Sequence, residues 1–155
     1  MMILIIIAAV VLDQAAKYLV VTRMAVNQSY PIIKNILHFT YIDKNTGMVF
    51  GIFQGGNVIL LVMATLFTGL IIWFMMKEKE RWTKIALAMV AGGAIGNIID
   101  RIFRGGVVDF IDAQFIDFYI FNVADCFVCV GAGLMILMLL VSENGKDNSK
   151  GTSKG

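Results

Sequence analysis

The sequence predicts an all-α integral membrane protein: four transmembrane helices, a small extracytoplasmic β-sheet and a short interfacial segment. Two observations carry this prediction. Hydrophobic residues make up 59% of the 155 positions and charged residues only 15%, and four long apolar windows recur along the chain. A helix that crosses about 30 Å of hydrocarbon at about 1.5 Å per residue needs about 20 residues. Each window has that length, and the composition is unlike that of a soluble domain.

The four predicted spans cover about residues 2–22, 57–76, 83–102 and 120–141. The second, "NVILLVMATLFTGLIIWFMM", has no charged residue, whereas polar residues interrupt the other three. The first window lacks the basic start of a secretory signal, so we expect a retained helix. We expect residues 1–142 to form one membrane-embedded domain. Residues 143–155, rich in Gly, Ser and Lys, are predicted to be a disordered cytoplasmic tail.

Basic residues predict the orientation, because short cytoplasmic loops carry an excess of Lys and Arg. The connection 77–84, "KEKERWTK", and the segment after residue 141 are dense in basic residues. The other two connections are longer and hold fewer basic residues for their length. We therefore expect a multi-pass protein with both termini in the cytoplasm.

Two outer segments follow from this orientation. In residues 23–56, Leu37, Phe39 and Tyr41 alternate with other residues, which predicts a strand of a small sheet resting on the membrane surface. His38 belongs to the same strand. Residues 103–119 are expected to form a short interfacial strand or helix, with the acidic residues at 112 and 117 solvated in an aqueous loop.

Polar residues of the spans and of the outer connections gather at the outer face on this topology. Ionisable groups within spans are rare and usually mark function. Their convergence therefore predicts a polar site at the outer leaflet. The residues concerned are Asp13, Lys17, Asn45, Asn97, Asp100, Arg101, Asp109, Asn122 and Asp125.

Several of these residues have structural explanations that stay open at this point. Asp13 and Lys17 have the spacing of an ion pair within one helix. Asp100 beside its arginine neighbour at a helix end is also typical of an interfacial anchor. Gly92 and Gly96 form a small-xxx-small pattern, which predicts close helix packing.

The residue inventory limits the chemistry. The two cysteines, Cys126 and Cys129, are predicted to be small apolar core residues, and with His38 as the only histidine we expect no metal site. Carboxylates remain, and two of them sharing a proton suffice for an aspartyl mechanism. An ion or proton transporter and a non-catalytic membrane assembly protein are the alternatives. The net charge of +2 gives no indication of nucleic-acid binding.

Five motifs in order resemble the lipoprotein signal peptidase family, the type II signal peptidases of bacteria. They are "DQAAK" (13–17), "NTGMVFG" (45–51), "GGAIGNIIDR" (92–101), "VVDFID" (107–112) and "FNVAD" (121–125). The resemblance implies an intramembrane aspartyl endopeptidase. Such an enzyme removes the signal peptide from prolipoproteins just before a cysteine that carries a diacylglyceryl group.

The resemblance also implies roles for individual residues. Asp109 and Asp125 match the catalytic pair, and Asp13 and Lys17 match supporting residues of the first helix. We expect no cofactor. The expected partners are lipid-modified prolipoproteins and membrane lipids, and the protein is expected to act as a monomer. The location is the bacterial cytoplasmic (inner) membrane, with the active site at the outer leaflet. Met48 and Val49 replace the family's small residues and put the fit of the substrate in question. The residues matching the substrate-binding positions are Asn45, Gly47, Asn97, Asp100, Arg101 and Asn122.

Overall fold

The computed structural model describes residues 1–45, 56–116 and 118–151. Within these residues the chain forms four long helices and three strands. Expectations for Gly47, Met48 and Val49, and for the acid at 117, therefore lie outside the described residues. The elements are α1 (Met2–Arg23), β1 (Ser29–Ile33), β2 (Leu37–Asn45), α2 (Gly56–Lys77), α3 (Arg81–Phe103), β3 (Val107–Ala113) and α4 (Val123–Gly151).

All four helices are long and apolar enough to cross a membrane. The candidate spans are Met2–Arg23, Asn57–Lys77, Arg81–Phe103 and Val123–Val141, which confirms the four predicted windows. Exposed large hydrophobic residues follow α1, α2 and the apolar part of α4, which have no other cover, whereas in α3 they lie only near the two ends. The helix α4 continues beyond its apolar part to Gly151, so no helix end marks the boundary predicted after residue 142.

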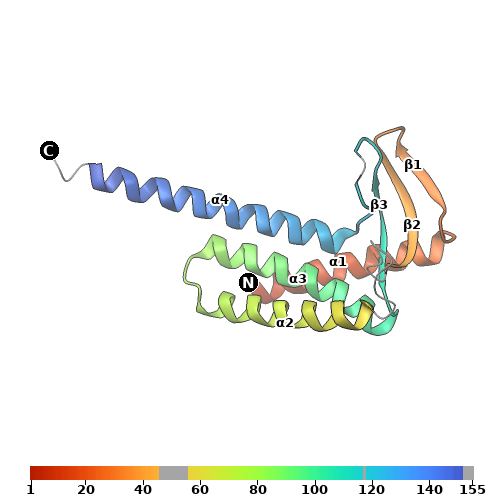
Figure 1. Ribbon diagram of the computed structural model, residues 1–155, viewed down its shortest axis with the longest axis horizontal. Coiled ribbons are helices and arrows are strands. Elements are labelled where there is room, and N and C mark those ends of the chain that lie inside the picture. The colour runs from red at the N-terminus through yellow and green to blue at the C-terminus, as the bar shows by residue number, and fades with distance from the viewer. Residues whose placement is uncertain (46–55, 117, 152–155) are drawn as a thin grey trace.

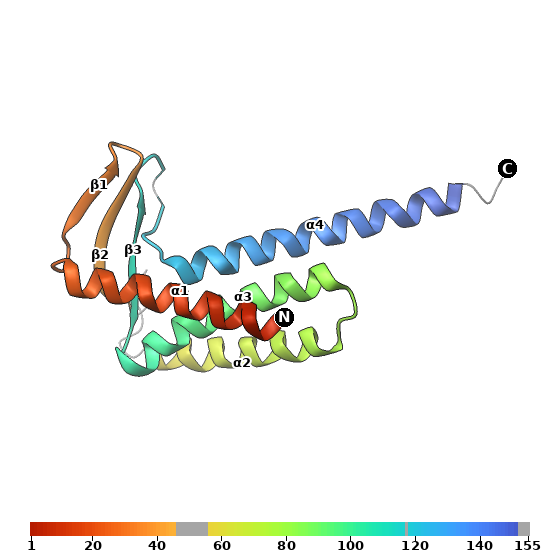
Figure 2. The ribbon, with the colours of Figure 1, turned by 180° about the vertical axis from the view of Figure 1, so that it is seen from behind.

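The helices form a bundle around α3, which contacts each of the other three. The connection between α2 and α3 and the far part of α4 lie at the end of the bundle away from the sheet, and α1 runs toward the sheet (Figures 1 and 2). This arrangement brings the end of α1, the end of α3 and the start of α4 together beside the sheet.

Small residues allow α3 to approach its neighbours closely, as the small-xxx-small pattern predicts. A Cβ atom on Gly93 would collide with the backbone carbonyl oxygen of Ala124 in α4. A Cβ atom on Gly96 would lie 2.6 Å from a carboxylate oxygen of Asp13 in α1. Glycine is therefore needed at both positions for helix packing, and the second position also leaves room for a buried acid.

The three strands form an antiparallel sheet in the order β1-β2-β3. Phe39 of the central strand pairs with Tyr30 on one side and with Ile111 on the other. The register shifts twice between β2 and β3, on either side of the pair Ile42–Asp109. Such shifts bend a strand and re-aim its side chains. The predicted strand that contains His38 is confirmed.

Apolar packing fixes the sheet to the bundle. Val20 near the end of α1 joins Tyr41, Val108 and Phe110 in a buried cluster. All of β1 is exposed, whereas β3 is almost entirely buried. The strand that carries Asp109 is therefore held between the bundle and the rest of the sheet.

Asp112 corrects the expectation of a solvated loop. It lies in β3, is buried, and accepts hydrogen bonds from the Thr40 hydroxyl at 2.8 Å and from the Gln114 side chain at 2.6 Å. A hydrogen-bond donor on the adjacent strand replaces lost contacts with water, so an acid can be buried there at a low cost in free energy. Single-sequence patterns do not reveal such a cross-strand partner.

Candidate active site

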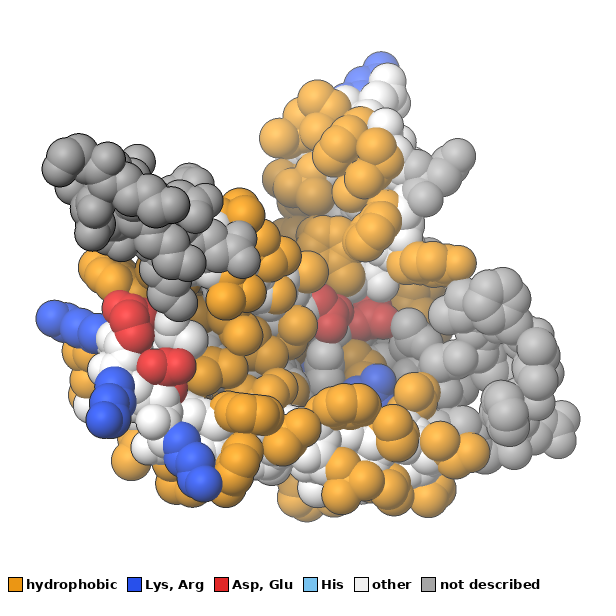
Figure 3. Space-filling model, turned by 60° about the vertical axis from the view of Figure 1, so that its left-hand side comes forward, with side chains coloured by type: hydrophobic (Ala, Val, Ile, Leu, Met, Phe, Trp, Pro, Cys, Tyr) orange, Lys and Arg blue, Asp and Glu red, His pale blue; other side chains and the backbone are white. Residues whose placement is uncertain are grey.

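A cavity of about 740 Å³ opens beside the sheet, and its lining combines residues from four elements. Leu60 comes from α2, Asn97 and Arg101 from α3, Asp109 from β3, and Asp125 from α4. In Figure 3, acidic and basic side chains lie at the bottom of a hollow that hydrophobic side chains border. The two acids that the sequence singled out thus face one cavity, although they belong to different elements.

Asn122, which immediately precedes α4, connects the two carboxyl groups. Its side-chain Oδ1 accepts from the backbone N–H of Asp125 at 3.1 Å, and the Asp125 carboxylate accepts from the backbone N–H of Asn122 at 3.1 Å. This reciprocal pair has the geometry of a capping box, which satisfies two donors at the helix start. The Asn122 Nδ2 group also donates to Asp109 Oδ1 at 2.7 Å. One fully buried residue therefore binds both carboxyl groups, Asp109 through its side chain and Asp125 through its backbone N–H.

Asn97 has its amide orientation fixed by Lys17. The Lys17 ammonium can only donate, and it lies 2.9 Å from Asn97 Oδ1. Asn122 donates to the same oxygen at 3.1 Å. The amide nitrogen of Asn97 then points to Asp125 and donates to its Oδ1 at 2.8 Å. A chain of oriented hydrogen bonds thus leads from α1 to the Asp125 carboxylate.

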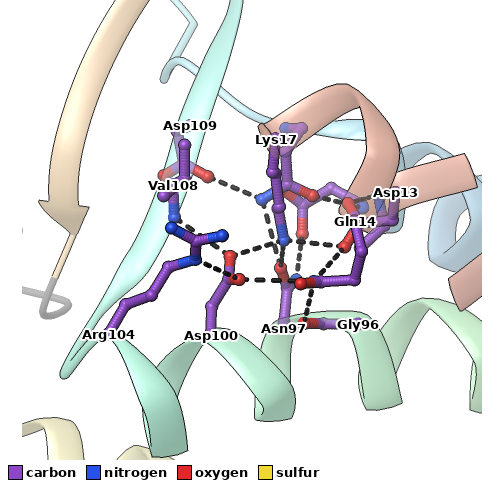
Figure 4. A network of polar contacts seen from close by, with 12 residues as sticks. Asp13, Gln14, Lys17, Gly96, Asn97, Asp100, Arg104, Val108 and Asp109 are labelled. Carbon is purple, nitrogen blue, oxygen red and sulfur yellow. Dashed lines mark hydrogen bonds and ion pairs between the residues drawn. The ribbon is translucent and has the colours of Figure 1, made fainter. Parts of the chain in front are cut away.

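Lys17 is the centre of a buried ion network (Figure 4). Its ammonium lies 2.9 Å from Asp13 and 2.8 Å from Asp100, and all three side chains are 0% exposed. With Asn97 as the third acceptor, every donor of the ammonium has a partner. The ion pair predicted from the spacing of Asp13 and Lys17 is present, and it belongs to a larger network.

The network also holds the two elements that carry the acids. Asp13 accepts from the backbone N–H of Ala124 at 2.9 Å, at the start of α4. Asp100 accepts from the backbone N–H of Val108 at 3.2 Å, next to Asp109 in β3. Asp100 is therefore not an interfacial anchor. It lies behind the cavity wall and ties α1 and α3 to the sheet.

Two members of the network were not predicted. The Gln14 side chain lies within 3.2 Å of Asp13, Asp100 and the Gly96 carbonyl oxygen. Arg104 lies 3.3 Å from Asp100, one turn away. The polar pair "DQ" inside an apolar span and the spacing of Asp100 and Arg104 are the signals that could have found them.

The two cysteines do not lie in a core, contrary to the prediction from the sequence. Cys126 is half-buried and Cys129 is exposed, and both line the cavity rather than a core. They follow Asp125 by one and four positions, so one face of α4 carries all three residues. The apolar character of the segment suggested a core, but the helical spacing from Asp125 indicates the cavity.

The electrostatics of the site combine two acids with one cation. The guanidinium of Arg101, on the cavity wall, interacts with Asp125 and Asp109. At the base of the sheet, burial and the neighbouring Asp43 raise the pKa of Tyr41 above its ordinary value, so this phenol stays neutral. Among the described residues, no group of three metal-ligating side chains is placed to hold an ion. The cavity lining includes two carboxyl groups, one guanidinium and two thiols.

The comparison with protein families decides the identity of the chain. The family model described as "Signal peptidase (SPase) II" matches residues 5–141. The chain belongs to the signal peptidase II family. It is thus a protease of the signal peptidase II type and a multi-pass bacterial membrane protein, as the five motifs indicated.

Relatives of the signal peptidase II family support the assignment over nearly the whole chain. The lipoprotein signal peptidase of Shouchella clausii is 45% identical over 142 residues, covering 90% of this chain and 93% of the relative. That of Halalkalibacterium halodurans is 40% identical over 145 residues, covering 91% and 92%. Two solved structures, each described as a bacterial membrane enzyme obtained by the in meso method, are similar throughout. One has a TM-score of 0.84 at 33% identity, covering 94% of this chain and 90% of the other. The other has a TM-score of 0.84 at 34% identity, covering 90% and 92%.

Proposed function

We propose that this signal peptidase II cleaves diacylglyceryl-modified prolipoproteins immediately before the lipidated cysteine, using Asp109 and Asp125 as its catalytic pair. One observation carries the proposal: two carboxyl groups from different elements line one cavity, and a single buried residue, Asn122, binds both, Asp109 through its side-chain amide and Asp125 through its backbone N–H.

The mechanism requires one proton shared between the two carboxyl groups. Neighbouring carboxylates do not both ionise cheaply, so the pair holds one proton and one negative charge. The ionised member takes a proton from water, which attacks the scissile carbonyl carbon, while the protonated member donates to the carbonyl oxygen. Proton transfer to the leaving amine then completes cleavage of the C–N bond.

Arg101 supplies the balancing charge. With one shared proton, Asp109 and Asp125 together carry a single negative charge, and the Arg101 guanidinium on the same wall neutralises it. A neutral site is compatible with a cavity that is otherwise apolar, where an uncompensated charge would be costly. We assign Arg101 and Asn97 to substrate and acid positioning, and Asp13, Lys17 and Asp100 to support.

The shape of the cavity suits a substrate that arrives from the bilayer. Both α2 and α4 pack on α3, and the cavity lies between them, with Leu60 and Val130 among its apolar lining residues. A signal peptide is itself an apolar segment, so hydrophobic contact supplies affinity with little dependence on its amino-acid sequence. The acyl chains of the lipidated cysteine fit the same apolar surroundings.

The orientation of the protein is part of the proposal. The connection 77–84 and the end of α4, both rich in basic residues, lie at the end of the bundle opposite the sheet (Figure 1). At the sheet end, Arg104 is paired with Asp100. We therefore give Arg104 less weight when basic residues are counted on the two sides of the membrane. The positive-inside rule then puts both termini in the cytoplasm and the acids at the outer leaflet. Residues 1–142 form the peptidase domain, which acts as a monomer in contact with membrane lipids, and 143–155 are the cytoplasmic tail.

A transporter is the competing reading, and the distribution of buried charges argues against it. Within the described residues, the buried charged side chains Asp13, Lys17, Asp100, Asp109 and Asp112 all belong to the sheet end. A relay across the membrane needs polar groups through its full thickness. The inner halves of the four helices are apolar.

The test is cleavage by purified protein in lipid. A diacylglyceryl-modified prolipoprotein should be cut just before the modified cysteine, and the matched substrate without the lipid should remain intact. Equal cleavage of both would refute the lipid requirement. Proton or sodium flux into liposomes without cleavage of either substrate would favour the transporter.

A further inference from the structure

Cys126 and Cys129 are the only two cysteines of the chain, and both line the active-site cavity. Cys126 adjoins Asp125, and Cys129 lies four residues after Asp125, about 6 Å from it along the axis of α4. Neither thiol forms a disulfide, and Cys129 is exposed. The apolar wall next to the proposed catalytic pair thus carries two free thiols.

The surroundings of these thiols determine which reagents reach them. Across the cavity lies Leu60 of α2, and the neighbouring residue on α4 is Val130, so the wall beyond Asp125 is apolar. Small apolar molecules partition into such surfaces, whereas charged ones stay in water. The cavity therefore favours membrane-permeant electrophiles over charged reagents of the same reactivity.

We propose that Cys126 and Cys129 form a thiol modification site through which apolar electrophiles block the substrate cavity of this enzyme. With an alkyl methanethiosulfonate, the thiol first loses its proton to solvent. The thiolate then attacks the sulfenyl sulfur, the new S–S bond forms, and methanesulfinate leaves with the electron pair. No other oxidant is needed, and a reducing thiol reverses the reaction by exchange.

The consequence for the substrate rests on the proposed function. A benzylthio group on either sulfur would occupy the wall along which an apolar signal peptide lies, one helical turn or less from Asp125. A displaced scissile bond loses its alignment with the carboxyl groups, so we expect cleavage to fall by about tenfold or more. Bound lipidated substrate should in turn shield the two thiols.

The experiment treats the purified protein in lipid with benzyl methanethiosulfonate and follows two readouts, intact mass and cleavage of lipidated prolipoprotein. We expect addition of two benzylthio groups to accompany loss of cleavage, and a reducing thiol to restore both the mass and the rate. The variant Cys126→Ala/Cys129→Ala should keep its own untreated rate after the same treatment. The single variants then show which thiol accounts for the loss.

A matched control places one thiol outside the cavity at a similar depth. Leu12 is exposed on α1 and adjoins Asp13, which bonds to the start of α4. In the cysteine-free background, Leu12→Cys should be modified without loss of cleavage, and excess lipidated substrate should not slow its modification. The native thiols should react more slowly in the presence of that substrate.

The outcomes separate this inference from the proposed function. Full modification with unchanged cleavage, or equal modification rates with and without substrate, would overturn the inference and leave the function intact. Absence of cleavage by untreated enzyme, combined with protection of the thiols by substrate, would refute the function and support the inference. Failure of either native thiol to react under conditions that modify Leu12→Cys would also overturn it.

Discussion

Lys17 offers the sharpest test of how the site is held together, through the substitution Lys17→Met. Methionine fills a similar volume but removes the charge. The ammonium has contacts of 2.9, 2.8 and 2.9 Å to Asp13, Asp100 and Asn97, and the three charged side chains are fully buried. Removing one partner of a buried ion pair leaves an uncompensated charge, at a cost of about 3–5 kcal/mol in the free energy of unfolding.

Thermal unfolding in detergent measures this cost. For a chain of this size, 1 kcal/mol shifts Tm by about 2–4 °C, so Lys17→Met should lower Tm by about 6–20 °C. Cleavage measured below the transition should also fall, because the amide of Asn97 loses one of the two donors that fix its orientation toward Asp125.

A double variant isolates the cause. In Lys17→Met/Asp13→Asn, one of the two stranded carboxylates becomes neutral, so we expect a higher Tm than in Lys17→Met alone. An unchanged Tm in the single variant, or a double variant in which the two losses simply add, would refute the account of Lys17 as the required counter-charge.

Three further predictions concern packing, capping and pH. Gly93→Ala should lower the free energy of unfolding by about 1–3 kcal/mol, because it forces α3 away from α4. The control Gly133→Ala, with nothing within 4 Å of the new Cβ atom, should leave Tm unchanged or raised. Equal effects of the two substitutions would contradict the close approach of α3 and α4 at Gly93. Asn122→Ser keeps an N-cap acceptor but loses the donor to Asp109, so it should lower cleavage with little change in Tm. Asn122→Ala should also lose about 1 kcal/mol of helix capping. Full activity of the serine variant would argue against the amide bridge between Asn122 and Asp109. The backbone N–H groups of Thr83 and Trp82 hold the pKa of Glu80 below its ordinary value of 4.5. Its contribution is therefore complete above about pH 4.5 and is lost as the pH falls through the lower folded value, and a Tm gap between wild type and Glu80→Gln that widens in acid would contradict this.

The fold was largely predictable because the bilayer imposes strong constraints on composition. Spans of about 20 apolar residues leave few alternatives, and the structure confirms all four windows. The period-2 alternation of Leu37, Phe39 and Tyr41 likewise predicted β2 correctly. The extension of α4 to Gly151 follows no apolar pattern, so hydropathy gave no sign of it.

The candidate site was predictable in its members but not in their connections. Rare polar residues within spans identified the acids, and the spacing of Asp13 and Lys17 indicated their pairing. The partners of Asp100 come from α1, from β3 and from the residue that follows α3, and no local pattern reveals that Val108 would donate to it. Cys126 and Cys129 were misassigned because apolar composition does not distinguish a core from a cavity that opens toward lipid.

The central claim is that Asp109 and Asp125 perform the cleavage together, and single-turnover cleavage of a lipidated prolipoprotein tests it most directly. Asp109→Asn and Asp125→Asn keep the size of the side chain and its capacity to accept a hydrogen bond. We predict that each variant elutes as a folded species and still abolishes cleavage, and that combining them causes no further loss, because the pair acts as one unit. Cleavage at the wild-type rate by either folded variant would contradict the claim.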